Sequence, residues 1–176
     1  MLEHLSIASS TEEDKKLVLP KTFLAPNLRH LTLLGIDISE RLRFLSYTVS
    51  LVTLVLTNTR ASGYFLPRTL VAHLWSLHQL EELTIGFSLP IPRPGAEREL
   101  SFKLATPVTL PNLKRLMFQG VSAYLKGLVA QIRAPLLERL EITFFKSNRL
   151  CITAPFPPPQ LNRSVPAPRC DCFLWK

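Results

Sequence analysis

The chain has 176 residues, a net charge of +8 and 47% hydrophobic residues. This length suits one domain with a sizeable core, and the apolar content excludes an intrinsically disordered chain. No apolar run reaches the ~18 residues of a membrane span, and the acids among residues 1–16 argue against a secretory signal.

The basic residues are scattered and do not alternate with aromatic residues, so we do not expect nucleic-acid binding. The three cysteines are Cys151, Cys170 and Cys172. An odd number of cysteines without a signal sequence favours free thiols in a reducing compartment, which predicts a cytoplasmic or nuclear protein. The Cys-x-Cys pair at 170–172 lacks the further ligands of a zinc site, so no metal is expected.

The spacing L-x-x-L-x-L, with isoleucine or phenylalanine accepted at the last position, occurs six times along the chain. The copies begin at residues 2, 28, 51, 80, 113 and 137, at intervals of 26, 23, 29, 33 and 24 residues. Two copies share their flanks: residues 26–36 and 111–121 both have Pro-Asn before the first leucine and glycine seven residues after it. Such intervals are typical of leucine-rich repeats.

The last two apolar positions of each copy predict a short strand with one buried face, because alternate side chains of a strand point to opposite sides. One copy cannot cover its own leucines, so neighbouring copies must stack. The expected fold is α/β: an irregular leucine-rich-repeat solenoid with helices or loops on the convex side and a parallel sheet of about six strands, near residues 5–7, 31–33, 54–56, 83–85, 116–118 and 140–142.

Three of the segments that join the strands are expected to be helical. Residues 37–46 begin with Asp37 and Glu40 at capping-box spacing, followed by Leu42, Leu45 and Val49 at helical spacing. The next helix has Pro67 at its first position and Leu70, Leu74 and Leu77 on one face; the third has Ser122 as a cap and Leu125, Leu128 and Ile132 on one face. Residues 86–110 contain Pro90, Pro92 and Pro94 and predict a loop.

The two ends of the chain depart from the repeat. Leu2 already belongs to a copy, so the expected repeat domain, residues 1–146, has an uncapped N-terminal end. Either the chain is a fragment, or this end is exposed and frayed. Residues 147–176 hold six prolines between Pro155 and Pro168 and are expected to form a disordered, proline-rich tail.

No catalytic arrangement is found in the sequence. The nucleophile elbow G-x-S-x-G, the phosphate-binding loop G-x-x-x-x-G-K-[ST] and the zinc motif H-E-x-x-H are all missing, and the four histidines have no ligand spacing. We therefore expect a protein that is not an enzyme and needs no cofactor.

The expected binding surface is the concave face of the sheet, formed by the residues before, between and after the inward-facing positions. Arg115, Arg139 and Glu141 are the strongest contact candidates, because arginine is enriched in binding hot spots. His4 and Ser6 would share this face. The full set of candidate partner-binding residues is His30, Thr32, Thr53, Val55, Thr57, Glu82, Thr84, Arg115, Met117, Gln119, Arg139, Glu141 and Thr143.

With these repeats and flanks, the chain resembles the leucine-rich-repeat region of fungal F-box-type proteins. The resemblance covers residues 2–146 and is carried by segments 25–37, 51–56, 70–90 and 110–145. It implies a substrate-binding module of a ubiquitin ligase receptor, with a protein client on the concave face. Contact with the ligase adaptor would require an F-box upstream, which this sequence does not show. The alternatives are a basic scaffold that binds nucleic acid or acidic surfaces, and an incomplete product without independent function.

Overall fold

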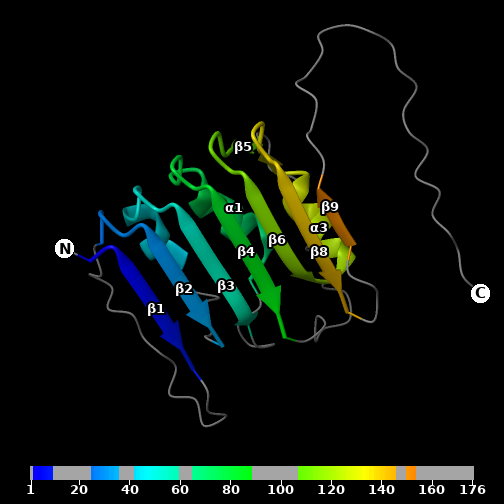
Figure 1. Ribbon diagram of the computed structural model, residues 1–176, viewed down its shortest axis with the longest axis horizontal. Helices are drawn as coiled ribbons and strands as arrows, with labels where there is room; N and C mark the ends of the chain where they lie inside the picture. Colours follow the sequence, from blue (N-terminus) through cyan, green and yellow to red (C-terminus); the bar gives the residue numbers. More distant parts are fainter. Residues whose placement is uncertain are drawn as a thin grey trace, which may run out of the picture.

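The computed structural model describes residues 2–9, 25–35, 42–59, 65–88, 107–145 and 150–153 (Figure 1). Six parallel strands lie side by side in chain order, which confirms the predicted α/β class and parallel sheet. The last of them is followed by an antiparallel neighbour, β9 (Leu150–Thr153). The parallel strands are β1 (His4–Ala8), β2 (His30–Leu34), β3 (Thr53–Thr59), β4 (Glu82–Phe87), β6 (Arg115–Gly120) and β8 (Arg139–Phe144).

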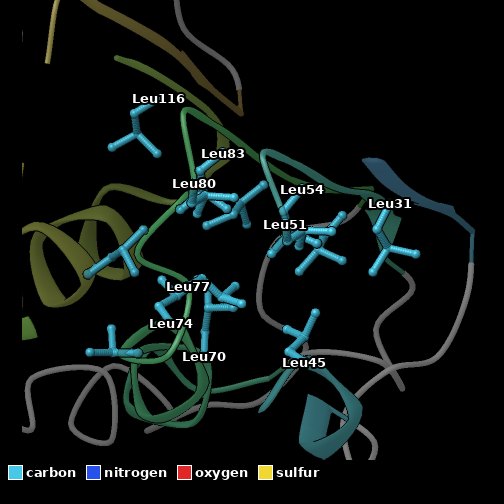
Figure 2. Close-up of a cluster of buried hydrophobic side chains, with 14 of the residues drawn as sticks. Leu31, Leu45, Leu51, Leu54, Leu70, Leu74, Leu77, Leu80, Leu83 and Leu116 are labelled. Carbon is cyan, nitrogen blue, oxygen red and sulfur yellow. The ribbon is translucent and has the colours of Figure 1, made fainter. Parts of the chain in front are cut away.

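The strands are in register, so the apolar positions of successive copies form continuous rows on one face. Leu31 pairs with Leu54, Leu54 with Leu83 and Leu83 with Leu116. These leucines are at most 4% exposed, and the same core holds Leu70 and Leu74. Figure 2 shows these sheet and helix leucines in one cluster. Burial of this row against the helices drives folding, since each leucine removed from water contributes about 1.5–3 kcal/mol.

Each strand from β2 to β4, and likewise β6 and β8, is entered through the same turn. The N–H of the first leucine of the copy donates to the carbonyl oxygen three residues earlier, at 3.0–3.3 Å. These leucines are Leu28, Leu51, Leu80, Leu113 and Leu137. The turn therefore places the first leucine of each copy just before the amino end of its strand.

A second backbone feature also recurs five times. The Glu3 carbonyl oxygen accepts two hydrogen bonds, from Arg29 N–H at 2.8 Å and His30 N–H at 3.0 Å. The equivalent carbonyls of the following copies each accept two consecutive N–H groups in the same way; they belong to Arg29, Val52, Glu81 and Lys114. The six sequence copies are thus matched by a repeated backbone geometry.

The helices lie on the face of the sheet that carries the buried leucines, here called the inner face, behind the strands in Figure 1. The second and third helices end earlier than predicted. Residues 42–47 form a 3-10 helix, η1 (Leu42–Tyr47), which ends where Thr48 N–H and Oγ1 both bond to the Leu45 carbonyl. Val49 therefore lies beyond the helix and is 49% exposed, so the prediction that it continues the helical spacing is wrong.

Helix α1 (Pro67–Leu74) has the predicted Pro67 at its start, but ends before Leu77. Leu77 is still buried, in the turn that follows, where its N–H donates to the Leu74 carbonyl oxygen at 3.0 Å and Ser76 Oγ donates to the His73 carbonyl oxygen. His73 Nδ1 lies 3.1 Å from Ser46 Oγ and so links α1 to η1.

Helix α3 (Ser122–Val129) starts at Ser122, and the capping position belongs to Val121, which makes no side-chain cap bond. The prediction of Ser122 as a cap is wrong by one residue. Ile132 is also not helical: it lies in β7 (Ile132–Arg133), which pairs with β5 (Val108–Thr109) in a small parallel sheet.

Strand β9 lies inside the segment expected to be a disordered tail. The sequence did not predict it. The loop predicted over residues 86–110 is wrong at both ends, since β4 continues through Phe87 and Val108–Thr109 form β5. The rest of that loop at 89–106, the predictions for Asp37 and Glu40, and the tail beyond Thr153 fall outside the described residues.

Candidate functional site

The candidate site is the face of the sheet opposite the helices, here called the outer face. The register places three rows of side chains across it. The first row runs from His4 and His30 through Thr53 and Glu82 to Arg115 and Arg139. The second row is Ser6, Thr32, Val55, Thr84, Met117 and Glu141. Thr57, Gln119 and Thr143 belong to the third row, so all thirteen candidate residues lie on this one face.

The outer face carries an ionic cluster over β4, β6 and β8. Arg115 Nη1 donates to Glu82 Oε1 at 3.2 Å, and Arg115 Nη2 lies 3.6 Å from Glu141 Oε1. Arg139 Nε lies 2.7 Å from the same oxygen, although its N–H is not aligned for a hydrogen bond. Two carboxylates and two guanidinium groups therefore balance in charge across three strands.

Exposure differs strongly within this cluster. The Glu141 side chain is only 13% exposed, whereas those of Arg115 and Arg139 are 39% and 45% exposed. The Glu141 carboxylate is therefore more buried than the two guanidinium groups that contact it. The terminal nitrogens of Arg139 contact no carboxylate among the described residues, which leaves them available to a ligand.

A neighbouring ion pair lies at the entry to the same strands. Lys114 Nζ donates to Glu81 Oε2 at 2.9 Å. This hydrogen bond, and then the Glu81 charge itself, raises the pKa of Lys114 above its ordinary value. The exposed pair ties β6 to the turn before β4.

A shallow pocket of about 170 Å³ opens on the outer face at the carboxyl ends of β3, β4, β6 and β8. Its lining consists of Thr57, Thr84, Ile85, Gly86, Met117, Phe118, Gln119, Glu141 and Thr143. Six of these are predicted contact residues. This volume is close to the ~150 Å³ of a cavity that holds one benzene molecule, so the pocket suits a single side chain of a partner.

Most polar side chains that line this pocket have no hydrogen-bond partner among the described residues. The side chains of Thr57, Thr84, Gln119 and Thr143 make no hydrogen bond to another described residue. The Glu141 contacts with Arg115 and Arg139 use Oε1 alone. Hydroxyl, amide and carboxylate groups are therefore presented together to a ligand.

Gly86 lines this pocket and was not among the predicted residues. A Cβ atom at Gly86 would lie 3.2 Å from Thr57 Cγ2, so a side chain at this position would crowd the Thr57 side chain, which lines the pocket. The pairing of β3 with β4 also shifts between Leu56 and Thr59, at the same place. Only the position of Gly86 two residues after Thr84 in the sequence could have indicated its role.

The N-terminal part of the outer face is different in character. The His4 and His30 rings are stacked, with centroids 4.3 Å apart and planes 7° from parallel. Thr32, Thr53 and Val55 follow without charge. The predicted candidates therefore fall into two groups, and the pocket at the carboxyl ends of β3, β4, β6 and β8 belongs mainly to the C-terminal group.

Comparison with protein-family models, with curated proteins and with solved structures finds no match for this chain. Among the described residues, no group of three or more His, Cys, Asp or Glu is placed to hold a metal ion. No helix in those residues is both long enough and apolar enough to cross a bilayer.

Proposed function

We propose that the chain is a protein-recognition module, an irregular leucine-rich-repeat arc that binds a protein client on its outer, concave face. The repeated entry turn and the repeated carbonyl that accepts two N–H groups support this architecture. In such arcs each copy adds one strand to a continuous binding surface.

The observation that carries the proposal is the pocket on the outer face. Its unpartnered hydroxyl and amide groups are held on sheet strands, whose backbone is fixed by pairing on both sides. Polar groups that are already positioned lose little entropy when a ligand binds, so they favour recognition.

The charge balance of the outer face favours a protein over a polyanion. Glu82 and Glu141 contact the two arginines of the cluster. The described part of this face therefore has no uncompensated basic stripe of the kind that phosphate backbones require. A client that presents one side chain to the pocket and a carboxylate to Arg139 would match both features.

The resemblance to F-box-type proteins supports a narrower proposal, in which the client is a substrate of a ubiquitin ligase. In that case the chain supplies substrate binding, and an upstream F-box supplies contact with the ligase adaptor. The client would bind the same outer face in the general proposal and in the narrower one.

The test is a pulldown from fungal cell extract with quantitative mass spectrometry. The bait is the full chain, compared with an Arg115→Glu plus Arg139→Glu variant. A matched control, Lys126→Glu plus Arg133→Glu, makes the same charge change at exposed positions in α3 and β7. We expect proteins enriched by the wild type and by the control to be lost with the outer-face variant. Equal enrichment with all three baits would contradict the proposal.

A further inference from the structure

At the β1 edge of the sheet, some backbone groups point away from every strand that the structure describes. Glu3 accepts hydrogen bonds from β2, and Ser9 N–H donates to the Leu34 carbonyl oxygen at 2.9 Å. Successive residues of a strand direct their backbone groups to alternate sides, so residues 3, 5, 7 and 9 face β2. The N–H and C=O groups of His4, Ser6 and Ala8 therefore face the opposite side, where no described strand lies.

The two edges of the parallel sheet differ in this respect. At the other edge β8 is covered by β9, which pairs with it through four residues. At β1, residues 2–9 contain no lysine, proline or bulge, the usual features that keep an edge strand from pairing. The inner side chains next to this edge, Leu5 and Ile7, remain half-buried, whereas their neighbours Leu31 and Leu33 are at most 1% exposed.

A second copy of β1 fits this edge when it runs antiparallel about a two-fold axis at Ser6. His4 then lies opposite Ala8 of the second copy, and Ser6 lies opposite its own equivalent. The backbone groups of these residues face no described strand, so each of the three pairs can exchange two hydrogen bonds. On the outer face of this pairing, no two side chains of like charge lie opposite each other.

The inner face of this pairing is also self-complementary. Leu5 lies opposite Ile7 of the second copy, and Ile7 opposite Leu5. Both pairs fall at positions without hydrogen bonds, where the Cα atoms of opposing residues are nearest, about 4.5 Å apart. Leu5 and Ile7 of each copy would thus cover Leu5 and Ile7 of the other copy, and the two sheets would join into one.

We propose that the chain forms a homodimer through antiparallel pairing of β1 with β1. The interface is one short strand on each side, so the dimer is weak and its population depends on protein concentration. Each copy carries a net charge of +8, and screening of this repulsion by salt should strengthen the dimer. The inference does not depend on the outer face as a client site.

The experiment is sedimentation equilibrium of the full chain over a hundredfold range of concentration, at low and high salt. Ser6→Pro removes the central outward N–H but none that bonds to β2, and Ser6→Lys places two lysines opposite each other at the two-fold axis. Ser6→Ala, the control, keeps the backbone groups. Ser6 is exposed, so these changes leave the core intact.

We expect the wild type and Ser6→Ala to shift from monomer to dimer as concentration rises, more so in high salt. Ser6→Lys and Ser6→Pro should stay monomeric, with unchanged circular dichroism. Amide exchange at Ser6 should slow as the wild type is concentrated. A wild type that is monomeric throughout, or a dimer that survives both substitutions, would overturn the proposal.

Discussion

Arg139 Nε lies 2.7 Å from Glu141 Oε1, on the same side of β8. The two residues are two positions apart, so their side chains leave the strand on one face. The register also brings Arg115 of β6 next to Arg139, and its Nη2 lies 3.6 Å from the same carboxylate oxygen. Glu141 therefore separates two arginines that would otherwise stand side by side with like charge.

Replacing Glu141 by glutamine should expose this repulsion. We expect the free energy of unfolding to fall by about 1 kcal/mol at low salt, the scale of a cross-strand ionic pair. Urea denaturation measures the change, and high salt should reduce it because screening weakens the Arg115–Arg139 repulsion. A loss of stability that is the same at low and high salt would show that the cause is not electrostatic.

Leu83 lies at the centre of the buried row and is fully buried. Leu83→Ala should lower the free energy of unfolding by about 2–5 kcal/mol, because it removes apolar contacts and leaves a cavity between sheet and helices. The adjacent Thr84→Ala, on the outer face, should change it by about 0.5 kcal/mol or less. Similar losses for the two variants in urea denaturation would be inconsistent with the assignment of the faces.

Gly35 combines a positive φ of 69° with a close approach to the preceding copy. A Cβ atom at this residue would lie 2.6 Å from the Ser9 carbonyl oxygen. Gly35→Ala should therefore destabilise the chain by about 1–3 kcal/mol. Asparagine tolerates the left-handed conformation but keeps the Cβ atom, so Gly35→Asn should recover only part of the loss. Full recovery with asparagine in thermal unfolding would mean that the contact with Ser9 costs nothing.

Lys114 should titrate above the ordinary value for lysine, because the hydrogen bond to Glu81 raises its pKa. A raised lysine pKa means that the ion pair stabilises the fold below pH 10.5 and that this contribution disappears as the pH rises through the folded-state pKa. An NMR titration of the lysine Cε signals tests this, with Glu81→Gln expected to lower the Lys114 pKa. An unchanged Lys114 titration in that variant would argue against the pair.

The strands could be predicted from the sequence because one leucine spacing fixes both the period and the buried face. Aligning the first leucines also gives the register, and hence the outer-face position of every candidate from His30 to Thr143. Helix ends were predicted less well. They depend on single side chains, such as Thr48 and Ser76, that bond to a carbonyl of the last turn.

The pocket and the ionic cluster needed the three-dimensional structure. Adjacent positions in the register show that Arg115 and Arg139 are neighbours, but not that both reach one oxygen of Glu141. Gly86 lacks a side chain, so a search for polar contact groups passes over it although it shapes the pocket. Strand β9 is short and lies outside the leucine spacing, so the repeat pattern could not predict that it pairs with β8.

Site-specific photocrosslinking in cells tests the central proposal, client binding on the outer face, most directly. A photoreactive residue is placed at Gln119, exposed beside the pocket, or at Trp75, which follows α1 and is 60% exposed. We predict crosslinks from position 119 to a discrete protein, lost when Arg115→Glu plus Arg139→Glu is added, and no such product from position 75. Crosslinks to the same protein from position 75 but not from position 119 would contradict the proposal.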